Sequence, residues 1–378
     1  MRNSLAEPLF EKIMGWSAAD FTQIMPELEA LSLFKYDEYQ QFFSGMKFIE
    51  SLACWLSQFE TKSEKEIALD FIRSNLIFIS SSEMTHLVAT SYLDLIRPII
   101  IRSVSEQEQI PEYLTNHIIK SREYQIQHRR SLFLGLSDGA HTDIFRRYNP
   151  DISNEQVYQT YEITGERTDE MLKRLNKDLS CICEHKFKDD ENRFRMLFLL
   201  DDFSGSGKSY LRCDNGKYDG KISRFCTSIC DSGNPMHRLI DQQNFKIYII
   251  LYVATKKAIQ NIKQTMDEAF GEKGISCDVK SAHLIDDSKS CNFLQNTEFV
   301  NLLTKYYDNS IENEHYKKGK IDHPYLGFDE CALPLILSHN TPNNSLPLLW
   351  YEEERKYWGL FPRISRHGGG KDGFSQSV

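Results

Sequence analysis

Short hydrophobic runs alternate with polar clusters in the second part of the chain. Five runs of five to seven residues are followed by Gly, Ser or Asp or by a helix-like segment: Leu132–Leu136, Met196–Leu200, Ile247–Val253, Val279–Ile285 and Leu333–Leu337. Buried runs of this length, separated by helical segments, are typical of a parallel α/β sheet. Ligands bind such sheets at the loops that leave the carboxyl ends of the strands. We therefore expect the polar clusters to share one edge of the sheet.

The first 125 residues have the spacing of helices. Steps of three and four residues connect a hydrophobic stripe between residues 42 and 59, made of Phe42, Met46, Ile49, Ala53 and Leu56. The segments 64–76 and 84–96 continue this pattern, and no catalytic constellation lies among them. The pattern predicts a helical N-terminal extension (1–125), an α/β domain with a C-terminal hood segment (126–366) and a disordered tail (367–378). Helices are also expected after a capping box at Ser153–Gln156 and over 256–270.

Composition and charge narrow the functional classes. The net charge of −9 disfavours nucleic-acid binding by the chain as a whole, and the basic triplet at 128–130 fits a solvated helix end better than a binding patch. The nine cysteines show neither a disulfide framework nor paired zinc knuckles, and no secretory leader or membrane-spanning run is recognisable. Reduced thiols in a cytoplasmic protein without membrane contact are the expectation.

The segment from Met196 to Ser209 combines features that suit a sugar phosphate. A hydrophobic run ends in Asp201 and Asp202, whose carboxylates can accept hydrogen bonds from ribose hydroxyls and attract Mg²⁺. Backbone N–H groups at a helix start can bind a phosphate, and a helix is expected to follow this loop. The candidate ligand-binding loop consists of Ser204, Gly205, Ser206, Gly207, Lys208 and Ser209.

Two other interpretations of this loop remain open. Gly207-Lys208-Ser209 matches the end of a P-loop, but Asp202 occupies the position where that motif needs its first glycine. An ordinary strand-to-helix turn with incidental acids is the second interpretation. Two adjacent carboxylates at the end of a buried strand are costly without partners, which disfavours it.

The same residues resemble the signature of phosphoribosyltransferases, in which two hydrophobic residues and two acids are followed by a Ser/Thr-Gly loop. Asp201, Asp202, Ser206, Gly207 and Ser209 meet each constrained position. The resemblance implies that the acids bind the ribose hydroxyls, that the loop holds the 5-phosphate of phosphoribosyl diphosphate, and that Mg²⁺ bridges ribose and diphosphate. Asp201 and Asp202 are thus the candidate catalytic and metal-binding residues.

Two further segments are candidate ligand sites. Ser137, Asp138 and Gly139 follow the first run, where the resemblance implies a diphosphate-binding loop, and Arg146 and Arg147 can meet diphosphate charge. For this loop taken alone, a simple Asp-Gly turn is an equal alternative. The last run leads to a segment rich in amides and aromatic residues that can hold a base-like acceptor or form a rigid turn, with His339, Asn340, Asn343 and Asn344 as candidates.

Over roughly residues 60–366 the chain resembles phosphoribosyltransferase-like proteins of bacterial conflict and antiphage loci, some of them retron-associated effectors. Besides Leu199–Ser209, the segments 134–139, 143–147 and 339–350 support this resemblance. It implies a defence role as a Mg²⁺-dependent phosphoribosyl or glycosyl transferase acting on phosphoribosyl diphosphate or a related nucleotide. The alternative is a non-catalytic nucleotide sensor or scaffold subunit. Protein partners encoded alongside, among them a reverse transcriptase–nucleic acid complex, and self-association are further expectations.

Overall fold

The computed structural model describes residues 3–286, 293–312, 316, 322–352 and 355–364. It divides the chain into two compact units: unit 1 comprises Met1–Ser81 with Ser288–Val378, and unit 2 comprises Ser82–Asp287. The boundary expected near residue 125 therefore falls within unit 2, because the helices between 82 and 129 pack there. The tail expected to be disordered (367–378) lies outside the described residues.

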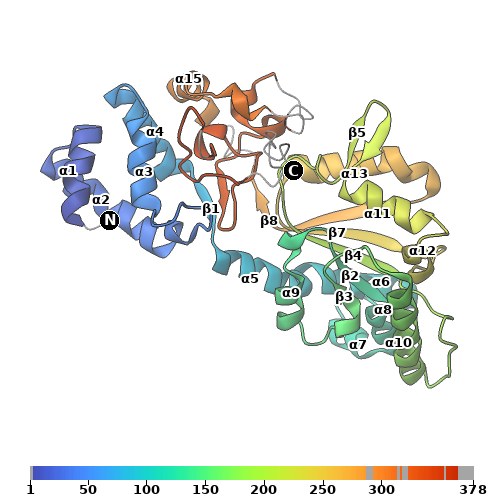
Figure 1. Cartoon of the computed structure of the whole chain (residues 1–378). Helices are drawn as coiled ribbons and strands as arrows, with labels where there is room; N and C mark the ends of the chain where they lie inside the picture. The colour runs from blue at the N-terminus through green and yellow to red at the C-terminus, as the bar shows by residue number, and fades with distance from the viewer. Residues whose placement is uncertain (1–2, 287–292, 313–315, 317–321, 353–354, 365–378) are drawn as a thin grey trace, which may run out of the picture. The chain divides into compact units, whose positions relative to one another are not determined.

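Unit 1 joins the two ends of the chain around one hydrophobic core. Its regular elements are α1 (Asn3–Met14), α2 (Ala18–Phe34), α3 (Phe48–Ser57), α4 (Lys62–Asn75), β1 (Ile77–Ile79), α15 (Thr297–Lys305) and β9 (Leu335–Leu337) (Figure 1). The helical stripe predicted between 42 and 59 forms a helix only from Phe48 onward. Trp55 on α3 is fully buried, and its indole N–H donates to the Leu348 carbonyl at 2.8 Å. Side chains from one end of the chain thus bind the backbone of the other end.

Unit 2 is built on a five-stranded parallel sheet with the order β3-β2-β4-β7-β8. Its strands are β2 (Ser131–Gly135), β3 (Val157–Tyr158), β4 (Met196–Ser204), β7 (Lys246–Thr255) and β8 (Cys277–Ile285). Its main helices are α5 (Ser81–Ser91), α6 (Arg97–Glu108), α7 (Thr115–Lys120), α8 (Arg122–Arg129), α9 (Thr142–Tyr148), α10 (Gly165–Cys183), α11 (Lys221–Cys230), α12 (Pro235–Leu239) and α13 (Lys256–Phe270). A π-helical turn, Tyr92–Ile96, joins α5 to α6.

Helices flank the sheet of unit 2 (Figure 1). One face packs on residues of α10, α11, α12 and α13, including Leu175, Phe225 and Ile262. The other face carries a ladder of stacked rings, in which Phe133, Phe198 and Tyr248 occupy the same level on β2, β4 and β7. These contacts confirm the predicted fold class, a parallel sheet flanked by helices with a helical N-terminal region.

Three details differ from the sequence-based expectations. The run at 333–337 does not join the five-stranded sheet: β9 pairs with β1 in a two-stranded sheet of unit 1. The edge of the main sheet is filled instead by the two-residue β3. The capping box at Ser153 forms, but it starts only a short 3-10 helix, Asn154–Gln156, because β3 begins at Val157.

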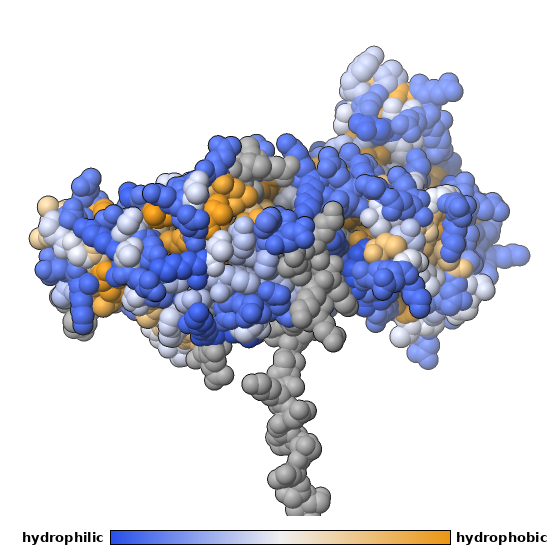
Figure 2. Space-filling model, turned by 90° about the horizontal axis from the view of Figure 1, so that it is seen from above, coloured by the Kyte–Doolittle hydropathy of each residue, from blue (hydrophilic) through white to orange (hydrophobic). Residues whose placement is uncertain are grey.

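No helix in the described ranges is both long and apolar enough to cross a membrane. Figure 2 shows a face on which hydrophilic side chains predominate and hydrophobic ones form small separate groups.

Candidate active site

Strand order places the acidic pair at the point where ligands bind in open parallel sheets. The chain moves outward from β2 to β3 and then returns to β4 on the other side of β2. Loops that follow β2 and β4 therefore diverge, and a crevice at such a switch point is the usual ligand site. Asp201 and Asp202 lie at the carboxyl end of β4, and Ser137 follows the carboxyl end of β2.

The two carboxyl groups have different surroundings, because adjacent side chains of a strand point to opposite faces of the sheet. Asp201 has no exposed surface, whereas Asp202 is only partly buried. The two members of the acidic pair are thus not equivalent.

Asp201 is surrounded by hydrogen-bond donors. Its Oδ1 accepts from the Ser137 hydroxyl. Its Oδ2 accepts from the Tyr210 hydroxyl at 2.7 Å and from the Lys221 ammonium group at 2.5 Å. Lys221 also lies 5.0 Å from the centroid of the Tyr210 ring. Both oxygens of this carboxylate are therefore engaged by side chains of the protein.

The charged groups around Asp201 shift its pKa in opposite directions. Burial raises the pKa of Asp201, and the neighbouring Asp202 carboxylate raises it further, while Lys221 and Ser137 act in the opposite direction. The raising effects are the larger, so the pKa of Asp201 stands above its ordinary value, and the Lys221 ammonium group offsets part of the cost of burying the charged form.

Asp202 lies against the loop that follows β2. A Cβ atom on Gly139 would stand 2.5 Å from the Asp202 carboxyl, so a larger residue there would require the Asp202 side chain to shift. The loop itself is held by Tyr252 of β7, whose hydroxyl donates to the Ala140 carbonyl at 2.6 Å. The structure thus brings together Ser137 and Gly139 with both acids, as the sequence predicts for the two loops.

The predicted phosphate loop is anchored to α13. Thr255 donates to the Gly205 carbonyl at 2.6 Å, and Asn261 donates to the Ser206 carbonyl at 2.9 Å. Ser204 to Gly207 are buried, Lys208 is half-buried and Ser209 is exposed. The backbone at Gly207 is left-handed, with φ near 80°.

The prediction that a helix directly follows this loop is wrong, because the helix begins later. A turn over 207–211 leads into the hairpin of β5 (Arg212–Asp214) and β6 (Lys217–Asp219), and α11 begins only at Lys221. Backbone bonds from Lys221 N to Ser209 O and from Ile222 N to Tyr210 O close the base of this hairpin. After Asp201 the chain completes β4, passes through the loop and the hairpin, and returns to the same carboxylate at Lys221.

The other residues predicted for the diphosphate loop are more open. Asp138 is exposed, as are Arg146 and Arg147 on α9. Arg147 lies 3.9 Å from Asp143 one helical turn earlier, a weak surface pair. The two arginine side chains are accessible to a solvent-borne anion, and the ligand-binding role of all three residues stays a prediction.

The four candidates of the hood segment belong to unit 1, where they stabilise its loops. The Asn340 amide donates to the Ile364 carbonyl at 3.2 Å, and the Asn344 amide donates to the Phe328 carbonyl at 3.0 Å. The backbone carbonyls of His339 and Asn343 accept from Gln41 and Phe328. Their role toward an acceptor stays a prediction.

The two acids differ in how well they suit a metal ion. Among the described residues, no group of three or more His, Cys, Asp or Glu side chains is arranged to hold one. The oxygens of Asp201 are engaged by Ser137, Tyr210 and Lys221, so this residue does not fit a direct Mg²⁺ ligand. Asp202 is partly exposed and is the better candidate for Mg²⁺ contact.

Sequence reasoning missed Tyr210, Lys221 and Tyr252. Tyr252 lies inside a hydrophobic run and Lys221 follows a hairpin, so neither stands at a fixed spacing from the acids. Burial raises the pKa of Tyr210 and of Tyr252 well above the ordinary range, and the Asp201 and Asp202 carboxylates raise both further. Both hydroxyls therefore act as hydrogen-bond donors rather than as bases.

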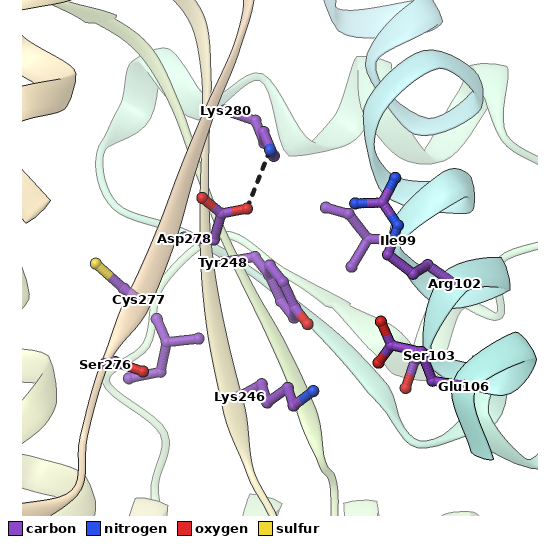
Figure 3. Close-up of a pocket in the computed structure, with 11 residues that line it drawn as sticks. Ile99, Arg102, Ser103, Glu106, Lys246, Tyr248, Ser276, Cys277, Asp278 and Lys280 are labelled. Atoms are coloured by element: carbon purple, nitrogen blue, oxygen red, sulfur yellow. Dashed lines mark ion pairs between the residues drawn. The ribbon is translucent and has the colours of Figure 1, made fainter.

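A pocket of about 370 Å³ lies at the opposite, amino end of β7 and β8 (Figure 3). Arg102 of α6 and Tyr248 of β7 contribute to its wall, and Asp278 there is paired with Lys263 and Lys280 at 2.8 and 3.1 Å. It contains none of the predicted site residues. We assign the candidate site to the acidic pair, because convergent titratable groups at a switch point indicate chemistry more strongly than volume does.

The parallel sheet, the acidic pair and the Gly/Ser loop define a phosphoribosyltransferase-like protein. Comparison with protein families matches residues 52–363 to the family described as PRTase-CE, and the chain belongs to that family. Comparisons with curated proteins and with solved structures find no match.

Proposed function

We propose that this protein binds phosphoribosyl diphosphate, or a related nucleotide, together with Mg²⁺, and transfers or cleaves its ribosyl-phosphate group. The observation that supports this most strongly is the pair Asp201–Asp202 at the switch point between β2 and β4. A partly exposed carboxylate suits two vicinal hydroxyls, and the following Ser/Gly loop suits a terminal phosphate.

The proposed reaction needs electrostatic support rather than a strong nucleophile. When the bond between ribose C1 and its leaving group breaks, positive charge develops on the sugar ring. A carboxylate held near that ring stabilises the charge, provided that it is already in place. Asp202 is the candidate for this role, since it remains partly exposed while Gly139 lies beside it. Asp202 would hold Mg²⁺, which would supply positive charge to stabilise the departing diphosphate.

The test is calorimetric titration of the full chain with phosphoribosyl diphosphate and Mg²⁺. Replacing both acids, Asp201→Asn with Asp202→Asn, should abolish binding in a protein that remains folded by circular dichroism. Asp214→Asn is the matched control, because Asp214 lies on the nearby hairpin and pairs only with Arg212 at 2.8 Å among the described contacts. Equal affinity in the wild type and the double variant would reject the proposal.

Turnover separates the enzyme from a non-catalytic sensor or scaffold subunit. Phosphorus NMR of the wild type with ligand and Mg²⁺ should show release of diphosphate or of another cleaved phosphate product. Binding without any new phosphorus signal across an acceptor screen would instead favour the sensor.

The sequence resemblance extends the proposal to defence against phage. Expression of the wild type with its neighbouring genes should reduce phage plating, and Asp202→Asn should remove that reduction. Protection that survives in a stably expressed Asp202→Asn variant would contradict a role for the site in defence.

A further inference from the structure

Asp201 and Asp202 have different roles in the site, and Lys221 is the residue that makes them different. We propose that the Lys221 ammonium group occupies, at the Asp201 carboxylate, the place that a divalent cation would otherwise take. Asp202, which is partly exposed, is then the member of the pair that meets the ribose hydroxyls and any Mg²⁺. This inference rests on the proposed function, which names the ligand. Whether Lys221 occupies a cation-binding position at Asp201 can nevertheless be tested without that ligand.

Hydrogen bonds from the protein engage both carboxylate oxygens of Asp201. Ser137 engages one oxygen, and Tyr210 and Lys221 engage the other. The residue has no exposed surface, so a ribose hydroxyl or a hydrated metal ion cannot reach it without displacing one of these donors. A displaced donor would leave a buried group unpaired, which is costly.

The backbone around Gly220 positions Lys221 next to Asp201. Gly220 adopts a φ of 125°, and a Cβ atom there would lie 2.3 Å from the Tyr210 carbonyl oxygen. This contact fixes the base of the β5–β6 hairpin and the first residue of α11. Lys221 therefore reaches Asp201 from a rigid helix start rather than from a solvated loop.

The charges of Lys221 and Asp201 are opposite and lie side by side. A single ammonium group compensates a single buried carboxylate, so Asp201 and Lys221 together are neutral. Asp202 is the next residue of β4, and its side chain lies on the other face of the sheet, beside Gly139. A site with one remaining carboxylate binds Mg²⁺ weakly by itself and depends on ligand phosphates for further oxygens.

The experiment measures binding of Mn²⁺, used as the probe, by electron paramagnetic resonance in the absence of phosphoribosyl diphosphate. Lys221→Met should create a metal site, with affinity at least about tenfold above the wild type, since it removes the positive charge that is paired with Asp201 Oδ2. Lys221→Arg should keep the wild-type behaviour because it restores the positive charge. Lys217→Met, on the exposed tip of the same hairpin, is the matched control and should change nothing.

A second variant covers the case in which Lys221→Met does not fold. The double variant Lys221→Met with Asp201→Asn removes both buried charges together, so it should fold by circular dichroism and should bind Mn²⁺ no more tightly than the wild type. Asp202→Asn alone should weaken the affinity for phosphoribosyl diphosphate by about tenfold or more, the loss expected for a hydrogen-bonded charge.

The outcomes separate the inference from the proposed function. Wild-type Mn²⁺ affinity equal to that of Lys221→Met, the same gained metal site in the double variant, or a double variant that unfolds overturns the role of Lys221. If the wild type binds no phosphoribosyl diphosphate, the proposed function fails, while a metal site gained in Lys221→Met still supports the cation-binding position at Asp201.

Discussion

The two units of this chain reach compactness by different means. Unit 2 is one continuous stretch whose parallel strands pair over five to eight residues at the central positions. Unit 1 joins the two ends of the chain, and its only described sheet pairs three residues of β1 with three of β9. Its cohesion depends instead on aromatic packing and on side chains that bind distant backbone groups, such as Ser51 with the Leu360 carbonyl at 2.6 Å. Backbone pairing thus dominates one unit and side-chain packing the other.

The largest expected effect would break the aromatic core of unit 1. Phe361 is fully buried, and five rings lie within 6 Å of its centroid: Tyr36, Tyr39, Phe42, Phe48 and Phe78. Phe361→Ala should lower the free energy of unfolding of unit 1 by about 3–5 kcal/mol, the usual cost of deleting a buried ring. Limited proteolysis during a thermal ramp should then release fragments from unit 1 before unit 2 is cut.

Phe34→Ala is the control for that experiment, because Phe34 is 85% exposed at the end of α2. It should leave stability within about 0.5 kcal/mol. Simultaneous cleavage of both units in Phe361→Ala would show that they do not unfold separately, and the comparison would fail.

A smaller effect would sharpen the account of unit 2. Gly220→Ala places a Cβ atom 2.3 Å from the Tyr210 carbonyl oxygen in a left-handed backbone, and should destabilise unit 2 by about 2–3 kcal/mol. Gly216→Ala has a similar positive φ of 77° but nothing within 4 Å, so strain alone should cost about 1 kcal/mol. Equal shifts in the urea midpoint for the two variants would mean that the close contact at Gly220 contributes nothing.

The smallest effect concerns pH and unit 1. Burial raises the pKa of Glu64, but hydrogen bonds from Lys305, the Thr61 backbone and Tyr306 outweigh it and lower the pKa to about 2 from 4.5. A lowered pKa in the folded state stabilises the protein above pH 4.5, and this contribution disappears as the pH falls toward 2. Glu64→Gln should therefore cost about 1 kcal/mol at pH 7 and less at pH 3, measured by denaturant unfolding.

Glu66→Gln is the control for that pH experiment. Glu66 forms only a long surface pair with Lys62 at 3.8 Å among the described contacts. Its replacement should have little effect at either pH. A loss in Glu64→Gln that is the same at pH 3 and pH 7 would contradict the assigned cause.

The same difference explains what the sequence could predict. In unit 2, four hydrophobic runs form strands of one sheet, as predicted: those containing Leu134, Leu199, Ile249 and Val279. These strands were predictable because a hydrophobic run and the turn residues beside it are local features of the sequence. The run at 333–337 also formed a strand, but its partner β1 is three residues long and lies more than 250 positions earlier, and no local pattern encodes such a pairing.

The candidate site divides in the same way. Asp201, Asp202 and the loop after them were recognisable, because their spacing along one strand and turn is itself the signal. Lys221 was not, because a hairpin separates it from the acids and only the close packing at Gly220 returns it to them. Side chains that meet through tertiary structure leave no fixed spacing in the sequence.

Hydrogen–deuterium exchange of the full chain, with and without phosphoribosyl diphosphate and Mg²⁺, tests the central claim most directly. Slower exchange is expected in two segments, 136–141 after β2 and 202–211 at the end of β4 and beyond it, which contain Asp202 and the two loops. Protection confined to the pocket at the amino ends of β7 and β8, or no protection in either segment, would contradict the placement of the ligand at the acidic pair.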